Sequence, residues 1–375
     1  MRVPLCDHKK LKGIPMETKK EQELCVKEYL EHLRKHLMPE IMDAECVAAL
    51  SAIEGQYGEL ITYGAGLEVR LGEQERYVDY IMDIDEDSMP PLNKLWYEVD
   101  YAEYRRAYER NTQIVPCIFA NVSHHVDGDD YALFWDKVLP KFLGAKRSAK
   151  LRPHLDRITA VLPAGARIKQ MGTMTGRGEF DIMRIVVFFP NLDAVMEGLK
   201  AFAWPGETES LKGAAAAWVS SNWIGVNLDI NASGVMPKLG LEIVPEWHQP
   251  ILVDKVIKQF EDAGLCLPEK GTALRRWIRL KPTDSPAIYT DIAYFKLNYR
   301  EGRIVEAKAY LQQQRPEVAR WLRKDAYQSN ERGFQNGKHQ QKRTHERTNR
   351  KGDGLRNRRG ADGAGKGRGR RAHEG

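Results

Sequence analysis

The sequence predicts an α+β fold in which pairs of helices alternate with two-stranded antiparallel hairpins, repeated along the chain as ααββ units. Two observations predict this order. Several long segments carry apolar residues at the spacing of an amphipathic helix. Between them lie four stretches in which polar and apolar residues alternate on both sides of a glycine-containing turn. At 375 residues, 42% of them hydrophobic, the chain is long enough to fill a large core.

The predicted helices are the segments in which apolar residues recur every three or four positions, and most of them follow one another in pairs. They are Met16–Leu37, Met42–Glu54, Leu92–Arg110, Tyr131–Leu143, Leu151–Leu162, Leu192–Trp204, Glu207–Ser221, Ile251–Ala263 and Glu317–Lys324. Amphipathic helices must bury their apolar face against another element. We therefore expect them to cover one face of the sheet that the hairpins build.

Four hairpins show strand-like alternation on both sides of their turn. The strand pairs are Gly66–Leu71 with Arg76–Ile84, Ile168–Met174 with Ile182–Phe189, Ile224–Ile230 with Pro237–Ile243, and Tyr294–Tyr299 with Ile304–Leu311. The spacing from hairpin to hairpin varies, so the repeat is one of structure and not of sequence with a fixed period.

Each predicted strand has one apolar and one polar face, because side chains alternate along a strand. The polar faces together carry Glu68, Arg70, Arg184, Lys238, Lys296, Lys308 and Tyr310. Long cations and tyrosines in this number are unusual on a face that is simply solvated. This favours a sheet that curves and closes around its polar face, with the helices outside. An open sheet whose polar face meets water is the alternative.

A partly buried cavity with several converging cations requires an anion, because desolvation and mutual repulsion would otherwise be costly. Lysine and arginine side chains hold phosphoryl oxygens well, so a diphosphate fits. Tyrosine rings beside such a site can stabilise a carbocation and shield it from water. A carboxylate on a neighbouring strand can take a proton from an attacking nucleophile. Together these groups describe prenyl transfer.

Short strand motifs in this chain resemble the ABBA prenyltransferases, whose ααββ units close into a barrel around the active site. The motifs are Leu67-Glu68-Val69-Arg70, with a glutamate shortly before a basic residue, Lys308-Ala309-Tyr310 late in the chain, Ile224-Gly225-Val226-Asn227, and the Lys238 strand. The nearest likeness is to bacterial cyanobactin-type enzymes that prenylate ribosomal peptides (RiPPs), and it covers most of residues 15–325.

The resemblance implies a role for each site residue. Glu68 would be the base that meets the acceptor. The residues implied to bind the diphosphate are Arg70, Arg184, Lys238, Lys296, Lys308 and Tyr310. Those implied to shield the carbocation and form the acceptor pocket are Tyr294, Asn227 and Tyr80, with Tyr310 also contributing a shielding ring.

The resemblance further implies a reaction, a cofactor and a strand count. A dimethylallyl or longer isoprenyl group would pass from its diphosphate to a side chain of a ribosomal peptide or to an aromatic acceptor, with Mg²⁺ present and the protein a monomer. The family usually has five ααββ units, whereas four hairpins are evident here. The apolar runs Ile114–Ala120 and Trp277–Leu280 are the candidates for the missing strands.

The charge of the chain divides between its body and its tail. Residues 331–375 carry 14 Lys or Arg and 5 Asp or Glu, a net charge of +9, whereas the whole chain is +6 and the remainder is therefore −3. We expect residues 1–325 to form one domain and residues 326–375 to be a disordered basic tail rich in glycine and arginine. The tail favours weak contact with nucleic acid. A solvated tail without a specific role is the alternative.

The compartment that the sequence predicts is the cytoplasm, without a membrane anchor. Met1–Lys10 lacks the apolar run of a secretory signal, and no segment is long and apolar enough to cross a membrane. The cysteines are five in number, scattered, and never spaced as CxxC. Reduced thiols are therefore expected, and a disulfide framework or a zinc site is not.

Three polar motifs are more typical of loops than of metal-binding or phosphate-binding sites. Asp83–Asp87 is typical of an acidic loop before Pro90-Pro91, and a magnesium site is the alternative. His124-His125 with the aspartates that follow matches no standard metal-ligand spacing. Gly172–Gly178 is rich in glycine but lacks the Lys-Ser/Thr of a phosphate loop.

The rival function for the whole chain is non-enzymatic: the body binds an acidic peptide or a phosphate ligand, and the tail contacts RNA.

Overall fold

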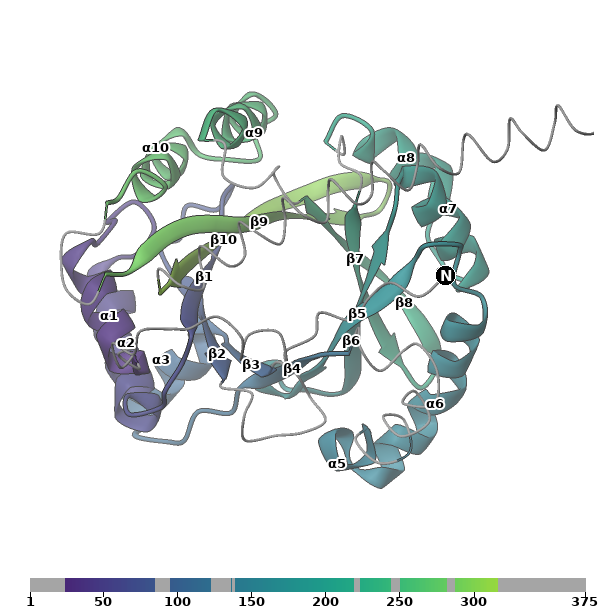
Figure 1. Cartoon of the computed structure of the whole chain (residues 1–375), viewed down its shortest axis with the longest axis horizontal. Coiled ribbons are helices and arrows are strands. Elements are labelled where there is room, and N and C mark those ends of the chain that lie inside the picture. Colours follow the sequence, from purple (N-terminus) through teal and green to yellow (C-terminus); the bar gives the residue numbers. More distant parts are fainter. Residues whose placement is uncertain are drawn as a thin grey trace, which may run out of the picture. The chain divides into compact units, whose positions relative to one another are not determined.

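The structure is a computed structural model that describes residues 24–84, 95–122, 136, 139–218, 223–243, 250–281 and 287–315. Ten strands in this part of the chain form one closed antiparallel barrel in the order β1-β10-β9-β8-β7-β6-β5-β4-β3-β2 (Figure 1). The strands are β1 Gly64–Arg70, β2 Val78–Ile84, β3 Leu95–Val99, β4 Cys117–Asn121, β5 Arg167–Met174, β6 Glu179–Phe189, β7 Ile224–Asn231, β8 Gly234–Ile243, β9 Tyr289–Arg300 and β10 Arg303–Gln314. The closed interpretation of the polar faces is therefore confirmed, and the open sheet is not.

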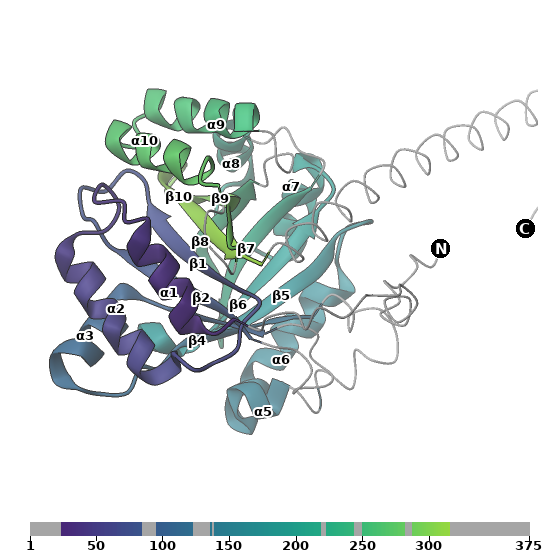
Figure 2. The same ribbon diagram turned by 60° about the vertical axis from the view of Figure 1, so that its left-hand side comes forward.

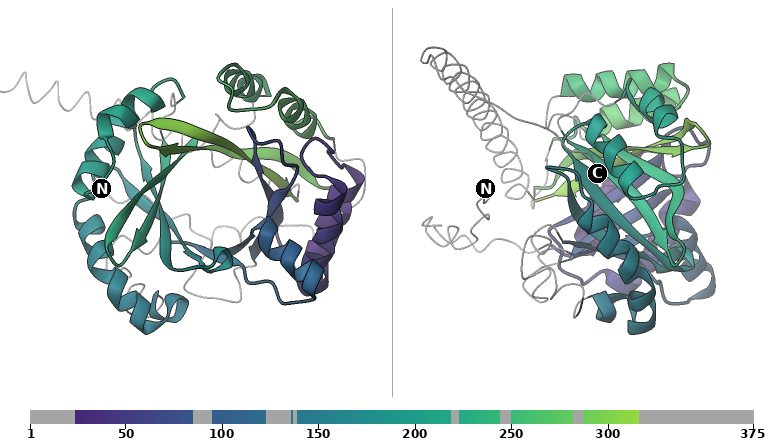
Figure 3. Two further views of the ribbon diagram at one scale, coloured as in Figure 1. Left: turned by 180° about the vertical axis from the view of Figure 1, so that it is seen from behind. Right: turned by 90° about the vertical axis from the view of Figure 1, so that its right-hand side faces the viewer.

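The described helices lie outside the barrel and mostly precede each hairpin in pairs (Figures 1 and 3). They are α1 Val26–Lys35, α2 Ala44–Tyr57, α3 Tyr101–Arg110, α5 Leu139–Leu143, α6 Ala145–Ala160, α7 Leu192–Ala201, α8 Thr208–Ala215, α9 Pro250–Asp262 and α10 Pro268–Trp277. Four ααββ units follow from this order, as predicted. Figure 2 shows α1 and α2 packed beside β1 and β2.

The fifth strand pair departs from the ααββ order. The predicted helix Leu92–Arg110 is wrong in its first part, because Leu95–Val99 is strand β3 and helix α3 begins only after Asp100. The run Ile114–Ala120 does contain a strand, β4, which pairs with β3. A single helix thus separates the two strands. In β3, buried Leu95 and Val99 face the helices while Trp96 and Glu98 face the barrel interior, which is strand periodicity.

The other candidate for the missing strands is helical. Trp277 is the last residue of α10, a helix that the sequence analysis did not predict. Its indole N–H donates to the carbonyl of Asp291 at the start of β9, and its ring is fully buried. The apolar run at Trp277 therefore reflects the packing of a helix end against the barrel.

The apolar core lies between the barrel and the helices. In β1, Leu67 and Val69 are completely buried and belong to this core, whereas Glu68 and Arg70 lie on the opposite face. The turns fit the strands that they join. Between β9 and β10 the two turn residues, Glu301 and Gly302, both have positive φ (51° and 85°), as a tight antiparallel hairpin requires.

Some predictions fall outside the described residues. These are the helix Glu317–Lys324, the domain boundary at residue 325 and the basic tail. Within the described ranges, no helix combines the length and the apolar character needed to span a membrane.

Candidate functional site

The barrel interior is lined by the polar faces of the strands, and cross-strand register brings the predicted residues together. Glu68 of β1 lies opposite Tyr310 of β10, and Arg70 lies opposite Lys308. Lys308 in turn lies opposite Lys296 of β9. Residues opposite one another in neighbouring strands share a face. The interior, which we call the lumen, therefore gathers side chains from both ends of the sequence.

Glu68 lies at the centre of the polar contacts in the lumen and is completely buried. Its carboxylate is 2.6 Å from the Lys308 Nζ and 3.5 Å from the Lys296 Nζ. The Tyr310 hydroxyl also donates to it. Burial disfavours the charged carboxylate, but Lys308 and Lys296 outweigh it and hold the pKa of Glu68 well below its usual range. Glu68 is therefore ionised and engaged on both oxygens.

The two lysines differ in their protonation energetics. Desolvation opposes the charge of Lys308, but the Glu68 carboxylate raises the pKa of this lysine. For Lys296, desolvation dominates and lowers the pKa despite the attraction of Glu68. Lys296 also donates to the Tyr310 hydroxyl and lies 4.7 Å from the centre of that ring. A second anion would stabilise the charge on Lys296.

Two tyrosines beside Glu68 form a stacked pair. The rings of Tyr294 and Tyr310 lie 4.1 Å apart between centroids with an interplanar angle of 18°. Burial raises the pKa of both hydroxyls well above the usual range, so both rings are neutral phenols. Such π faces stabilise a neighbouring cation.

Arg184 on β6 is held by a carboxylate of the next strand. Its Nε and Nη2 donate to the two oxygens of Asp229 at 2.7 and 2.9 Å. Asn227 is the neighbour of Asp229 on the lumen face of β7, and its side-chain amide donates to the Glu242 carboxylate at 2.7 Å. Burial raises the pKa of Glu242 despite this hydrogen bond. The predicted residues Arg184 and Asn227 are thus in the lumen.

Arg177 was not predicted as a site residue. It lies in a short 3₁₀ helix, Thr175–Arg177, within the turn between β5 and β6, and its side chain reaches the lumen. It is 3.0 Å from Glu98 and 2.8 Å from Asp100. Strand alternation cannot assign a turn residue to a face. The only sequence signal was an arginine in a glycine-rich turn beside a polar strand.

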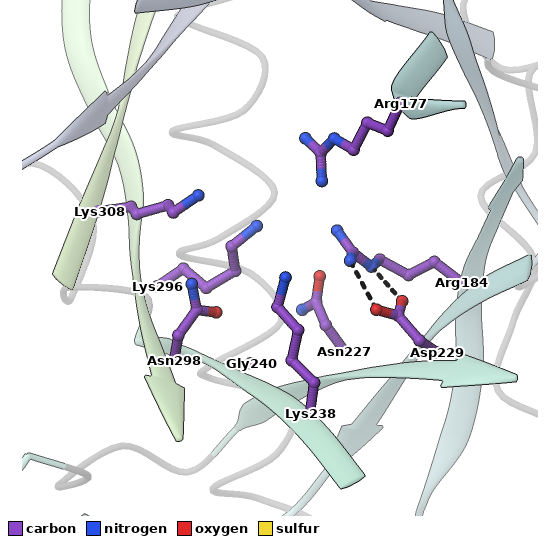
Figure 4. A pocket seen from close by; sticks show the side chains of 9 residues that line it. All are labelled: Arg177, Arg184, Asn227, Asp229, Lys238, Gly240, Lys296, Asn298 and Lys308. Atoms are coloured by element: carbon purple, nitrogen blue, oxygen red, sulfur yellow. Dashed lines mark hydrogen bonds and ion pairs between the residues drawn. The ribbon is translucent and has the colours of Figure 1, made fainter. Parts of the chain in front are cut away.

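The tips of five cations are directed toward one space in the lumen (Figure 4). The pocket is lined by Arg177, Arg184, Asn227, Asp229, Lys238, Gly240, Lys296, Asn298 and Lys308, and its free volume is about 10 Å³. That is room for roughly one water molecule. A diphosphate can occupy this space only if lysine and arginine side chains move apart.

A larger cavity adjoins this pocket at one end of the barrel. Its volume is about 340 Å³, and it shares Lys238 and Asn298 with the inner pocket. Its rim includes Glu73 and Leu265, so it is bounded by the β1–β2 turn and the α9–α10 connection. A cavity of this size accommodates a small ligand or a single side chain.

Lys238 lines both cavities and differs from the other cations. Within the described ranges Lys238 makes no hydrogen bond and has no carboxylate at ion-pair distance. It is also exposed. Partial burial of the amine and the neighbouring Arg184 guanidinium lower its pKa. Lys238 is thus the lumen cation most available to an incoming anion.

The opposite wall of the lumen carries aromatic and other apolar side chains beside Glu98. Trp96 of β3 and Phe119 of β4 stack at 5.6 Å with an interplanar angle of 8°. Phe119 packs with Cys117 and Met174 in a small buried cluster. Gly172 makes this wall possible, because a Cβ there would lie 2.2 Å from the Phe119 ring. We call this surface the apolar wall.

Two expectations about the site need correction. Tyr80, predicted for the acceptor pocket, lies opposite Leu67 and is buried in the core between barrel and helices, so it faces away from the lumen. The lumen is also not predominantly cationic. Its cations Arg70, Arg177, Arg184, Lys238, Lys296 and Lys308 are matched by the carboxylates Glu68, Asp79, Glu98, Asp100, Asp229, Glu242 and Glu306.

Arg70 is an example of a lumen cation that forms an ion pair with a carboxylate, Asp79, which the sequence analysis did not assign to the site. It is 2.8 Å from Asp79 on β2 and 3.9 Å from both Glu68 and Glu306. Burial, with repulsion by Glu68, raises the pKa of Asp79 to about 6 despite the ion pair. Asp79 could have been found from the sequence, since it alternates with Tyr80 in the second strand.

Metal-ligand clusters are absent from the described ranges: nowhere there do three or more His, Cys, Asp or Glu side chains converge in a way that could hold an ion. The remainder of the Asp83–Asp87 motif and the His124-His125 motif lie outside those ranges.

Comparison with known proteins found no matching family model and no curated protein with significant sequence similarity. Solved structures of prenyltransferases are similar at low level. PriB in its apo form has a TM-score of 0.43 and 12% identity, covering 75% of this chain and 95% of PriB. AnaPT from Neosartorya fischeri has a TM-score of 0.40 and 11% identity, covering 77% and 86%. PriB in complex with L-tryptophan and dimethylallyl thiolodiphosphate has a TM-score of 0.37 and 12% identity.

Proposed function

We propose that this protein is a prenyltransferase that moves a dimethylallyl or longer isoprenyl group from its diphosphate to a side chain of a ribosomal peptide or to an aromatic acceptor. The observation that carries the proposal is the convergence of five cations on one enclosed space beside a carboxylate and a stacked tyrosine pair. Cations of this number in a low-dielectric space stabilise the charge that develops on a departing diphosphate.

The reacting groups lie on the side of the lumen that β1 and β8 to β10 form. The bond between the allylic carbon and the diphosphate oxygen breaks, and its electron pair leaves with the diphosphate, which Lys238, Lys296 and Lys308 hold. The allyl cation lies against the rings of Tyr294 and Tyr310 and is kept from water. The acceptor atom forms the new carbon bond, and its proton passes to Glu68. The apolar wall suits the hydrocarbon chain and an aromatic acceptor ring.

Magnesium remains part of the proposal in a limited form. Magnesium is commonly bound by one or two carboxylates together with substrate phosphates, and it keeps several waters. The described residues provide no preformed cluster, so the ion would arrive on the diphosphate. Glu306, on the same strand face as Lys308 and near the wider cavity, is a carboxylate within reach of it. When bound, the ion would neutralise part of the diphosphate charge.

The direct test is mass spectrometry of candidate peptides and aromatic amino acids incubated with the full chain, dimethylallyl diphosphate and magnesium. We expect a mass increase of one prenyl unit that Glu68→Gln abolishes. If no acceptor gains mass with dimethylallyl, geranyl or farnesyl diphosphate, the proposal fails.

The rival function remains a binding protein without catalysis whose basic tail contacts RNA. The observation in its favour is the net charge of +9 on residues 331–375, which would attract phosphate groups without requiring the barrel. The rival predicts tight RNA binding that is lost on deletion of residues 331–375, together with a barrel that does not consume an isoprenyl diphosphate.

A further inference from the structure

The lysine pair that the proposed function assigns to the diphosphate is already occupied. Glu68 has its carboxylate 2.6 Å from Lys308 and 3.5 Å from Lys296, and the Tyr310 hydroxyl donates to it. Both lysines are also wall residues of the inner pocket. A carboxylate and a phosphoryl group present the same feature to an ammonium, namely anionic oxygens at hydrogen-bond distance. Glu68 therefore satisfies these lysines in the way that a diphosphate would.

The free volume of the pocket leads to the same conclusion. About 10 Å³ is open beside the lysines, which is far less than a diphosphate needs. The anion must displace something, and the Glu68 contacts are those that tie Lys296 and Lys308 to the β1 side of the lumen. Lysine side chains are long and flexible, so they can exchange one anion for another without backbone movement.

We infer that Glu68 is an internal competitor of the isoprenyl diphosphate, and that donor binding releases it from Lys296 and Lys308. This inference rests on the proposed function and adds an order of events to it. The donor binds first, and only then is the Glu68 carboxylate free to meet the acceptor. Lys238, which has no recorded partner among the described residues, provides the first contact at the boundary of the wider cavity.

The exchange also changes the chemistry of Glu68. The charged groups that face it are Lys308 on β10, Lys296 on β9, Arg70 on β1, Arg177 in the β5–β6 turn, and the carboxylates Asp79 on β2 and Glu98 on β3. As long as Lys296 and Lys308 interact with Glu68 and not with a diphosphate, the Glu68 carboxylate is a very weak base. A bound diphosphate would neutralise the two largest attractions and add repulsion, which makes the carboxylate more basic. Glu68 thus becomes able to accept a proton when the donor is in place.

The test uses inorganic pyrophosphate as the probe and the full chain as the protein. Isothermal titration compares the wild type with Glu68→Gln, which removes the competing charge. We expect Glu68→Gln to bind pyrophosphate about tenfold more tightly, or better, since coupling between competing sites is commonly 5–150-fold. Glu209→Gln is the matched control, because Glu209 is exposed on α8 and pairs with exposed Lys200, away from the lumen. The affinity of this variant for pyrophosphate should equal that of the wild type.

A second variant guards against misfolding, since Glu68→Gln leaves buried lysines unpaired. Glu68→Asp keeps the charge but withdraws the carboxylate by one methylene, and it should bind pyrophosphate more tightly than the wild type but less tightly than Glu68→Gln. Thermal denaturation with and without pyrophosphate confirms that each variant is folded. Affinities of the two variants that equal or fall below that of the wild type overturn the inference alone. If the wild type and both variants all fail to bind pyrophosphate, the proposed function fails with it.

Discussion

The two walls of the lumen contrast in almost every physical property. The wall formed by β1 and β6 to β10 carries paired ions, among them the bidentate Arg184–Asp229 contact and the Lys308–Glu68 contact. The wall formed by β3 to β5 carries stacked rings and Met174, together with Glu98, which pairs with Arg177 of the β5–β6 turn. An isoprenyl diphosphate has the same division between a charged end and a hydrocarbon end. One barrel can therefore hold the whole donor only because its two walls differ.

The ion pairs of the lumen should be more sensitive to disruption than its apolar contacts. Arg177→Met is expected to lower the free energy of unfolding by about 3–5 kcal/mol, because it leaves the buried carboxylate of Glu98 and the half-buried carboxylate of Asp100 unpaired. Urea denaturation measures this value. The matched control is Arg279→Met, whose arginine is exposed and pairs with Asp254 at 3.2 Å, and which should cost less than about 1 kcal/mol. Equal costs for the two variants would contradict the account of the lumen ion pairs.

The apolar wall should respond to added volume. Gly172→Ala places a methyl group 2.2 Å from the Phe119 ring, so the stack with Trp96 must shift. We expect a loss of about 1–3 kcal/mol in stability, measured by denaturant unfolding, and a change in the near-ultraviolet circular dichroism of the rings. Gly213→Ala is the control. That position in α8 has open space around it, so the alanine should stabilise the helix by up to about 1 kcal/mol.

The smallest expected effect is a pH dependence at the edge of the charged wall. The pKa of Asp79 is raised from 3.8 to about 6, so its contribution to stability is fully present below about pH 4 and is lost as the pH rises through about 6. Unfolding free energies measured from pH 4 to pH 7 should therefore fall more steeply in the wild type than in Asp79→Asn. Glu68 has the opposite sign, since its pKa is lowered, and its contribution is lost only at more acidic pH. Identical slopes in the two proteins would show that Asp79 is not perturbed.

The fold could be predicted largely because strand periodicity survives in the sequence. The alternation of Glu68 with Leu67 and Val69 assigns each residue to a face, and the register of β1 with β10 confirms it. Strand β3 was not predicted, because Trp96 and Tyr97 in Leu95–Val99 are compatible with either a helix or a short strand. Its pairing with β4 decides the matter, and that contact is not local in sequence.

The site was less predictable than the fold. Alternation placed Lys238, Lys296 and Lys308 correctly, but it gave no indication that carboxylates from other strands would pair with the lumen arginines. Asp229 meets Arg184, and Glu98 meets Arg177, only through the closure of the barrel. The expectation of an unpaired cationic cavity therefore failed for a physical reason. A buried charge is costly unless an opposite charge lies nearby, and here the fold brings that partner from a strand distant in the sequence.

The release of inorganic diphosphate from dimethylallyl diphosphate tests the central claim most directly. It requires the charged wall but no knowledge of the acceptor, because without one the allyl cation is captured slowly by water to give the alcohol. The account predicts that the wild-type full chain releases diphosphate, that Lys308→Met reduces the rate by about 10²–10³, and that Lys200→Met, at an exposed position on α7, leaves it unchanged. No release by the wild type with dimethylallyl, geranyl or farnesyl diphosphate, or an unchanged rate in Lys308→Met, would contradict it.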